Sequence, residues 1–242
     1  MDETSKSFLD KVISIDKALQ DANVPFGVSG AIALSNYVRE YRGTDDIDIG
    51  VFLPVEEGLE ILNILSGLGA STDDIDLDIV RRGEWVKVYW DDTPVDIFFA
   101  STEVGRRGAE TTRPGNFAGT QIPIVSAEVL MFFKMGFNRG QDWLDIRAML
   151  LEDPQIDTQW VSEALVSEYG SRRGIRRRIR RLSVIRRSVA QQLAKPPLTN
   201  SDNTHSYKSG QQPKNNTICG HWMPIAKRRC VLPADHRGKH RR

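Results

Sequence analysis

The stretch from Phe26 to Phe52 constrains this 242-residue chain more than any other segment. A short apolar strand ends in the small-residue pair Ser29-Gly30, and residues 31–41 then have the pattern of a helix. Residues 46–53 alternate acidic and apolar side chains and become wholly apolar before Pro54, as in a half-buried strand. This block predicts a strand, a turn, a helix and a second strand in immediate succession.

The second strand of that block carries two acidic residues. Asp46 and Asp48 are two positions apart, so their side chains point to the same side of a strand. Two such carboxylates repel each other unless a cation neutralises them, and Mg²⁺ prefers one or two carboxylates together with substrate phosphates. The backbone N–H groups of the Ser29-Gly30 turn, at the start of the expected helix, suit a triphosphate. The block predicts a phosphoryl- or nucleotidyl-transfer site, and a pair of plain surface charges is the alternative interpretation.

Hydrophobic periodicity predicts the other elements. An amphipathic helix opens the chain at 4–22, with Thr4 or Ser5 as its cap, and a helix at 56–68 precedes three strands at 74–80, 84–90 and 93–100. A Gly-rich, Arg-containing connection at 104–120 leads to helices at 126–137, 142–151, 158–169 and 171–193. We expect an α/β (α+β) fold, with a mixed β-sheet that has helices on one side, a helical extension and a basic C-terminal arm.

Composition divides the chain into parts with different tasks. Residues 1–170 contain 14 Lys and Arg against 30 Asp and Glu, whereas residues 171–242 contain 19 against 2. Residues 196–217 are polar and nearly free of apolar side chains, so burial cannot offset their ordering entropy. We expect a catalytic core at 1–120, a helical extension at 121–170, an Arg-rich helix at 171–195, a disordered linker at 196–217 and a Cys/His basic tail at 218–242.

Composition also excludes some classes of protein. No stretch approaches the roughly 18 apolar residues of a membrane span, and the N-terminus lacks the apolar run of a signal peptide. Both cysteines lie in the last 24 residues, so no disulfide framework is expected in the main body. We expect a cytoplasmic protein without a membrane partner.

The acidic block resembles the nucleotidyltransferase superfamily related to DNA polymerase beta. That signature is a hydrophobic residue, a Gly-Gly or Gly-Ser pair and, after a gap, Asp-x-Asp. The residues that carry it here are Ser29, Gly30, Arg42, Thr44, Asp46 and Asp48. Within the superfamily, Arg-x-Thr-x-Asp-Ile-Asp is similar to the AbiEii-type toxins and related small nucleotidyltransferases. The family has a third carboxylate on a later strand, and the segment 94–98, which contains Asp96, resembles that strand.

The resemblance covers roughly residues 20–150 and implies a two-metal mechanism. It implies that Asp46 and Asp48 hold two Mg²⁺ ions and that Asp96 completes the second site and helps to activate an attacking hydroxyl. Nucleotide binding is implied for Ser29, Gly30, Arg42, Thr44 and Lys134. The family also has paired acids on a following helix, which Asp142 and Asp145 resemble, beside Arg139.

Each of these assignments has an alternative. Residues 71–76 nearly repeat residues 43–48, although only the first copy follows a Ser-Gly turn and a helix. Asp96 is interpreted otherwise as an exposed strand residue, and Lys134 as a snorkelling side chain on an apolar helix. Asp142 and Asp145 are interpreted otherwise as helix N-terminal charges that favour the dipole.

The C-terminal third adds two further candidate sites. Arginines at 172–187 form a cationic surface suited to RNA, and the alternative is that they pair with the acidic body. Thiolate and imidazole ligands suit Zn²⁺, and the tail offers four, with His221 as a spare: Cys219, Cys230, His236 and His240. A disordered basic terminus is the alternative interpretation of the tail.

These observations predict a Mg²⁺-dependent nucleotidyltransferase that moves an NMP from an NTP, such as ATP, to an acceptor hydroxyl. The basic arm favours RNA, such as a tRNA end, as the acceptor, and the toxin resemblance implies an antitoxin protein as a partner. The alternatives are a small-molecule (antibiotic-type) nucleotidyltransferase and a catalytically idle nucleic-acid-binding protein that keeps the fold.

Overall fold

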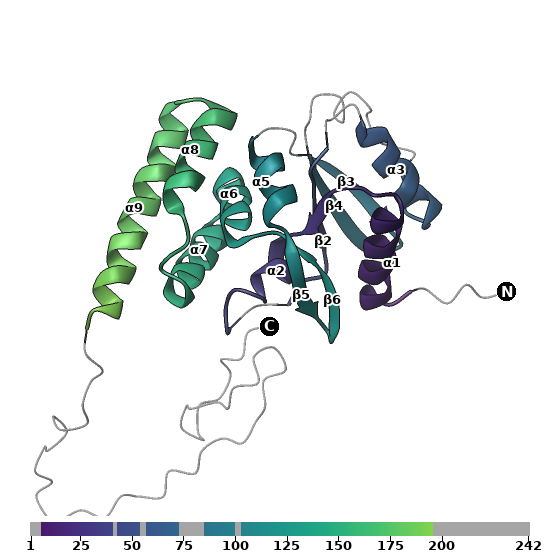
Figure 1. The fold of residues 1–242 in the computed structure, drawn as a ribbon, viewed down its shortest axis with the longest axis horizontal. Coiled ribbons are helices and arrows are strands. Elements are labelled where there is room, and N and C mark those ends of the chain that lie inside the picture. Colours follow the sequence, from purple (N-terminus) through teal and green to yellow (C-terminus); the bar gives the residue numbers. More distant parts are fainter. Residues whose placement is uncertain (1–5, 41–42, 54–56, 73–84, 100–102, 196–242) are drawn as a thin grey trace, which may run out of the picture. The chain divides into compact units, whose positions relative to one another are not determined.

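The computed structural model describes residues 6–40, 43–53, 57–72, 85–99 and 103–195 (Figure 1). Several predicted features lie outside the described residues. These are the strand at 74–80, the second acidic copy at Asp74 and Asp76, the candidate ligand Arg42, the linker at 196–217 and the Cys/His tail. Within the described part of the chain, no helix is long and apolar enough to cross a membrane.

The centre of the fold is a mixed six-stranded sheet in the order β3-β4-β2-β1-β6-β5. Its strands are β1 (Phe26–Val28), β2 (Ile47–Val51), β3 (Val86–Trp90), β4 (Thr93–Phe99), β5 (Arg113–Phe117) and β6 (Thr120–Ile124). β2 pairs parallel with β4, and β1 pairs parallel with β6. The other three neighbours, β1 with β2, β3 with β4 and β5 with β6, are antiparallel. The predicted mixed α/β fold is confirmed.

Helices cover both faces of this sheet, so the expectation of helices on one side is wrong. Helices α1 (Phe8–Asp21) and α3 (Gly58–Gly67) lie on one side, and α5 (Glu103–Thr111) and α6 (Ala127–Phe137) on the other (Figure 1). Phe98 of β4 contacts the rings of Phe133 and Phe137 from α6, with centroids 5.5 and 5.2 Å apart. Ile97, the residue directly before Phe98 on β4, is fully buried on the opposite face. Apolar side chains on both faces of the central strands require cover on both sides.

The opening helix α1 begins later than the sequence indicates. Ser7, rather than Thr4 or Ser5, is its N-cap, and the Ser7 hydroxyl accepts a hydrogen bond from the Asp10 amide at 3.2 Å. The apolar stripe of α1 is buried as predicted, with Leu19 and Ile15 at 1% exposure or less. The cap and the stripe together fix where this helix starts and which side faces the sheet.

Helix α2 (Gly30–Leu34) has five residues, much shorter than the predicted helix at 31–41. The Ser35 hydroxyl and the Asn36 amide both donate to the Ile32 carbonyl. Such side-chain hydrogen bonds compete with continuation of the helix. Asn36 also donates to the carbonyl of Asn116, which ties the end of α2 to the strand β5.

The connection expected at 104–120 is instead an ordered helix and a hairpin. Helix α5 and the antiparallel strands β5 and β6 occupy this region, and β6 continues the sheet to Ile124. The hairpin turn is Ala118-Gly119, and both residues have positive φ, 49° and 88°. A two-residue turn with positive φ at both positions matches the twist of paired strands. The glycines that predict a loop here have other roles: Gly119 lies in the hairpin turn, and Gly108 allows Phe52 to pack closely against α5.

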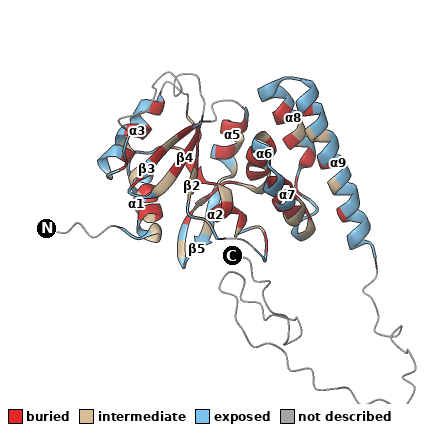
Figure 2. Cartoon of the chain, turned by 180° about the vertical axis from the view of Figure 1, so that it is seen from behind, coloured by how far each residue is buried: buried red, intermediate tan, exposed pale blue. Residues whose placement is uncertain are grey.

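The helical extension contains α6, α7 (Gly140–Glu152) and α8 (Thr158–Tyr169), and the Arg-rich helix α9 (Arg173–Leu193) follows it. Ser126 caps α6 at the start of the helix expected at 126–137, since its hydroxyl accepts from the Val129 amide. Along the apolar stripe of α9, Ile175, Leu182 and Val189 are buried in a helix that contacts α7 and α8, whereas Leu193 at its end is exposed. Figure 2 shows the rest of α9 largely exposed.

Candidate active site

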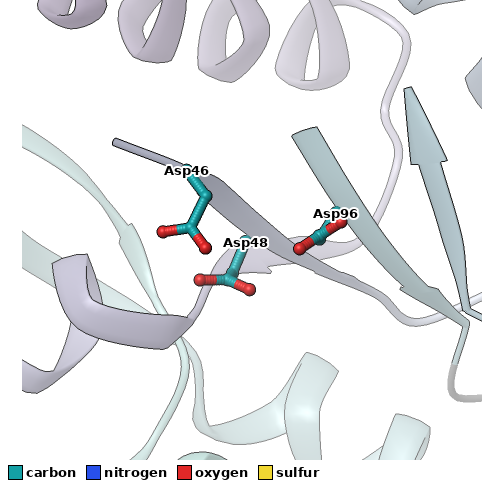
Figure 3. A group of neighbouring side chains, drawn as sticks. All are labelled: Asp46, Asp48 and Asp96. Carbon is teal, nitrogen blue, oxygen red and sulfur yellow. The ribbon is translucent and has the colours of Figure 1, made fainter. Parts of the chain in front are cut away.

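Three carboxylates meet where β2 and β4 run side by side. Asp46 directly precedes β2, Asp48 lies within it, and Asp96 is the parallel-register partner of Asp48 on β4. One oxygen from each residue lies within 4.8 Å of the others (Figure 3). The period of two places the first pair on one face, and the strand register brings the third carboxylate to it. Among the described residues, this is the cluster of acidic side chains suited to a metal ion.

The Ser29-Gly30 turn fits directly against Asp48. The Ser29 amide donates to the Asp48 carbonyl at 2.8 Å. Gly30 has a φ of +59°, and a Cβ atom at this position would lie 1.7 Å from the Asp48 carboxylate. Only glycine meets both the backbone and the space requirement here. The turn and the carboxylates therefore form one unit, as the sequence predicts.

Thr44 contacts one of the acids. Its hydroxyl donates to the Asp46 carboxylate and accepts from the Asp46 amide at 3.3 Å. This local turn fixes the orientation of Asp46 just before the strand begins. The structure thus places Thr44 where it can position a carboxylate.

Burial and the repulsion between the carboxylates raise the pKa values of two acids in the cluster. Burial, followed by the charges of Asp46 and Asp96, raises the pKa of Asp48 to about 7, while Lys134 and Arg139 oppose the rise. Burial also raises the pKa of Asp96, against the opposing effect of Lys87. A divalent cation among these oxygens would favour the ionised forms, and an all-carboxylate donor set fits Mg²⁺.

Lys87 is a site residue that the sequence analysis missed. It lies on β3 directly opposite Asp96, and its Nζ atom is 3.0 Å from Oδ1 and 3.2 Å from Oδ2 of that carboxylate. The sequence places Lys87 in a strand of alternating residues. Its contact with Asp96 follows only from the pairing of β3 with β4. Asp96 is 7% exposed, so it is not a free surface residue.

Lys134 is buried rather than snorkelling. It is 4% exposed, and its Nζ atom lies 2.6 Å from the Asp145 carboxylate, which also accepts from Gln141. The charge of Lys134 still lowers the pKa of Asp48, so the residue lies close enough to act on the cluster. Asp145 is therefore the partner of Lys134 at the junction of α6 and α7.

Arg139, which the sequence analysis names beside Asp142 and Asp145, is a further cation near the cluster. It precedes α7 and forms a capping box with Asp142, whose carboxylate accepts from the Arg139 amide at 2.8 Å. The interpretation of Asp142 as a helix N-terminal charge is borne out by this cap. The guanidinium also opposes the raised pKa values of Asp48 and Asp96, so it adds positive charge beside the carboxylates.

A cleft of about 690 Å³ opens between α9 and the turn that contains Asn138. Its other lining residues are Gly174, Arg177, Arg178, Arg180, Arg181 and Val184. Arg178 donates to the Met135 and Gly136 carbonyls at the end of α6, and Arg181 lies over the ring of Trp143. Within the described part of the chain, no α9 arginine makes a salt bridge with a carboxylate. The alternative in which these arginines pair with the acidic body finds no support there.

No protein-family model and no curated protein matches this chain. Among solved structures, it is similar to the antibiotic-resistance factor ANT(2'')-Ia in solution, with 17% identity and a TM-score of 0.43 over 79% of this chain and 95% of that chain. The crystal structure of ANT(2'')-Ia with adenylyl-2''-tobramycin has 18% identity and a TM-score of 0.43 over 77% of this chain and 98% of that one. An antigenic nucleotidyltransferase-like protein from Paracoccidioides brasiliensis has 14% identity and a TM-score of 0.41 over 70% of this chain and 91% of that chain. At such identities and scores, the activity has to be argued from the side chains of this chain.

Proposed function

We propose that this protein is a Mg²⁺-dependent nucleotidyltransferase that moves a nucleoside monophosphate from an NTP to an acceptor hydroxyl. The observation that carries the proposal is the cluster of Asp46, Asp48 and Asp96 against the Gly30 turn. Three acids that face one another at a partly buried position repel one another and cost stability, and such perturbed clusters are typical of functional sites. The resemblance of the block at 26–52 to nucleotidyltransferases gives the reaction class.

Each residue of the cluster has a role in this proposal. Asp46, Asp48 and Asp96 would hold Mg²⁺, which when bound steadies the attacking and leaving oxygens. Thr44 holds Asp46 in orientation, and Gly30 leaves room for the Asp48 carboxylate. Ser29 and Gly30 would hold the phosphates of the NTP, and Lys134 and Arg139 add positive charge near Asp48.

The transfer balances without any further reactant. A bond forms between the acceptor oxygen and the α-phosphorus, and the bond from that phosphorus to the bridging oxygen of the β-phosphate breaks. Pyrophosphate leaves with the bonding electron pair. Asp96 assists removal of the acceptor hydroxyl proton.

Exchange of single carboxylates tests the reaction. We expect Asp46→Asn or Asp48→Asn to lower the transfer rate at least about a hundredfold, since each removes a charged metal ligand. Asp45→Asn is the matched control, because Asp45 is exposed and is not part of the carboxylate cluster. Transfer of label from α-labelled NTP to total RNA, with pyrophosphate release, measures the rate. Equal activity of all three variants would contradict the proposal.

We further propose that the acceptor is RNA, bound through the α9 arginines. The support is a row of guanidinium groups that make no salt bridge within the described residues and line the cleft beside Asn138. Asn138 is followed by Arg139, whose charge acts on the carboxylate cluster. A backbone of phosphates along α9 would therefore lead to the site of transfer.

A further inference from the structure

The edge strand β3 carries two exposed aromatic side chains beside the carboxylate cluster. Trp85, directly before β3, is 45% exposed, and Tyr89 within it is 50% exposed. Lys87 lies between them, with its Nζ atom 5.6 Å from the centre of the Trp85 ring. We call these three residues, Trp85, Lys87 and Tyr89, the aromatic strip.

Strand alternation fixes the face on which the strip lies. Val86, Val88 and Trp90 are at most 4% exposed and face the core, so the three residues between and before them face the other way. Lys87 pairs in register with Asp96 and contacts its carboxylate at 3.0 Å. The strip therefore lies on the same sheet face as the carboxylate cluster and borders it directly.

The strip and the phosphate-facing turn lie on opposite sides of the cluster. The strand order β3-β4-β2-β1 places Asp96 of β4 between the strip and Asp48 of β2. The Ser29-Gly30 turn follows β1 and contacts Asp48 from the far side. An NTP held by that turn would leave the strip free, so the strip is in the position of the acceptor.

The chemistry of the strip fits an unpaired nucleic-acid strand. Single exposed aromatic residues are common on surfaces, but here two flank a lysine that contacts an acid of the candidate active site. Tyr89 is four positions after Trp85 along an extended strand. The two rings are therefore about 13 Å apart, which leaves room for a base on each ring. Bases stack on such rings irrespective of sequence, and a lysine between them neutralises the intervening phosphate.

We propose that the aromatic strip binds the terminal bases of a single-stranded RNA acceptor and thereby directs its terminal hydroxyl toward Asp96. This inference rests on the proposed function, because it assigns the acceptor side of the same site. It names the substrate class as an unpaired RNA end, with stacking as the main recognition and little dependence on base identity. A duplex end, whose bases are already stacked on each other, would not use the strip.

Binding without catalysis tests the strip. The probe is a labelled single-stranded RNA oligonucleotide with a 3′-deoxy end, and its Kd is measured by fluorescence anisotropy in EDTA with the full chain. We expect Trp85→Ala and Tyr89→Ala each to raise the Kd about five- to 150-fold, the range for loss of one stacked base. Trp85→Phe should keep most of the affinity because it retains a ring.

Leu144→Ala is the matched control, since Leu144 is 62% exposed on α7 and the change also removes an exposed apolar side chain. Its Kd should stay within twofold of that of the unmodified protein. Thermal melting of each variant should also be unchanged, because the strip residues are exposed. If an alanine variant melts early, Trp85→Leu or Tyr89→Leu provides the test, since leucine keeps an apolar side chain but removes the ring.

The outcomes separate this inference from the proposed function. Unchanged Kd values for both alanine variants overturn the strip, while transfer that depends on Asp46 still supports the proposed function. Loss of affinity in a protein that transfers no nucleotide supports the strip and contradicts the proposed function. Equal loss of affinity for a blunt RNA duplex overturns the strip, since stacking on a free end would then not explain it.

Discussion

At the scale of single residues, Gly30 and Asp48 show how closely backbone and carboxylate are fitted. The positive φ of Gly30 and the 1.7 Å approach of an added Cβ to Asp48 leave no space for any side chain. Asp48 in turn carries a pKa raised to about 7, chiefly by burial. Position 30 therefore controls the geometry of the cluster, and Asp48 controls its charge.

Substitution of Gly30 should damage both stability and cation binding. We expect Gly30→Ala to cost about 2 kcal/mol of unfolding free energy, because it combines strain at positive φ with a clash against Asp48. Gly174→Ala on α9 is the control, since a Cβ there meets nothing within 4 Å. Urea unfolding measures the loss, and the rise in Tm on adding Mg²⁺ should shrink only for Gly30→Ala. A Gly30 variant as stable as the control would contradict the fitted turn.

The raised pKa of Asp48 predicts a pH dependence of stability in metal-free protein. In the unfolded chain Asp48 ionises near 3.8, whereas in the folded protein it does so near 7. The unfolded state therefore binds fewer protons between these values, so stability should fall as pH rises from about 4 to about 7. Asp48→Asn should lack this part of the fall in urea unfolding with EDTA. Mg²⁺ should raise the Tm more at pH 8 than at pH 5, and equal shifts would contradict the assignment.

At the scale of elements, the helical extension is joined to the site by the buried pair of Lys134 on α6 and Asp145 on α7. Both side chains are at most 6% exposed, and Gln141 supplies a further hydrogen bond to Asp145. A buried ion pair contributes little net stability, but removal of one partner leaves an uncompensated charge. The pair thus fixes the relation of two helices and keeps a positive charge near Asp48.

The buried pair gives a prediction with an internal control. Lys134→Met should lower the unfolding free energy by about 3 kcal/mol, because Asp145 loses its counter-charge. Addition of Asp145→Leu in the same chain should recover most of that loss. Chemical unfolding of the single and double variants measures both, and an additive double variant would show that the two side chains are not coupled.

At the scale of the whole described molecule, the acidic body and the Arg-rich helix α9 carry opposite charge. The α9 arginines make no salt bridge with a carboxylate within the described residues, and their guanidinium groups line the open cleft beside Asn138. The eight arginines of α9 repel one another unless an anion binds. This separation of charge supports a polyanion as the partner of α9.

Removal of cleft arginines should weaken RNA binding in a salt-dependent way. We expect Arg177→Ala together with Arg180→Ala to lower the affinity and to reduce the slope of log Kd against log salt by about 1 for each lost phosphate contact. Arg106→Ala is the control, since Arg106 is paired with Glu103 and Glu110 on α5. Filter binding across a salt series measures the slope, and equal slopes for all proteins would exclude α9 as the phosphate-binding surface.

A zinc site in the Cys/His tail is a separate prediction. The tail lies outside the described residues, so this site stays a prediction. Elemental analysis of the full chain should find one zinc per chain, which Cys219→Ser should remove without changing the melting of the body. Zinc-free protein purified under reducing conditions would contradict the site.

The sequence by itself determined the features that depend on neighbours in the chain. The period of two placed Asp46 and Asp48 on one face, the Ser29-Gly30 pair marked the turn, and the apolar stripe of α9 gave its buried side. The mixed α/β fold followed from such local patterns. The resemblance brought Asp96 into the prediction, although nothing local to Asp96 indicates that it meets Asp48. Membership of the AbiEii group stays a prediction.

Only the tertiary structure decided what depends on residues far apart in the chain. The register of β2 with β4 brought Asp96 to the cluster, and that of β3 with β4 set Lys87 on it and turned the aromatic strip to the same face. Packing of α6 and α7 paired Lys134 with Asp145. Local sequence preferences do not specify such register and packing, because these depend on which apolar faces can be buried together across the whole sheet.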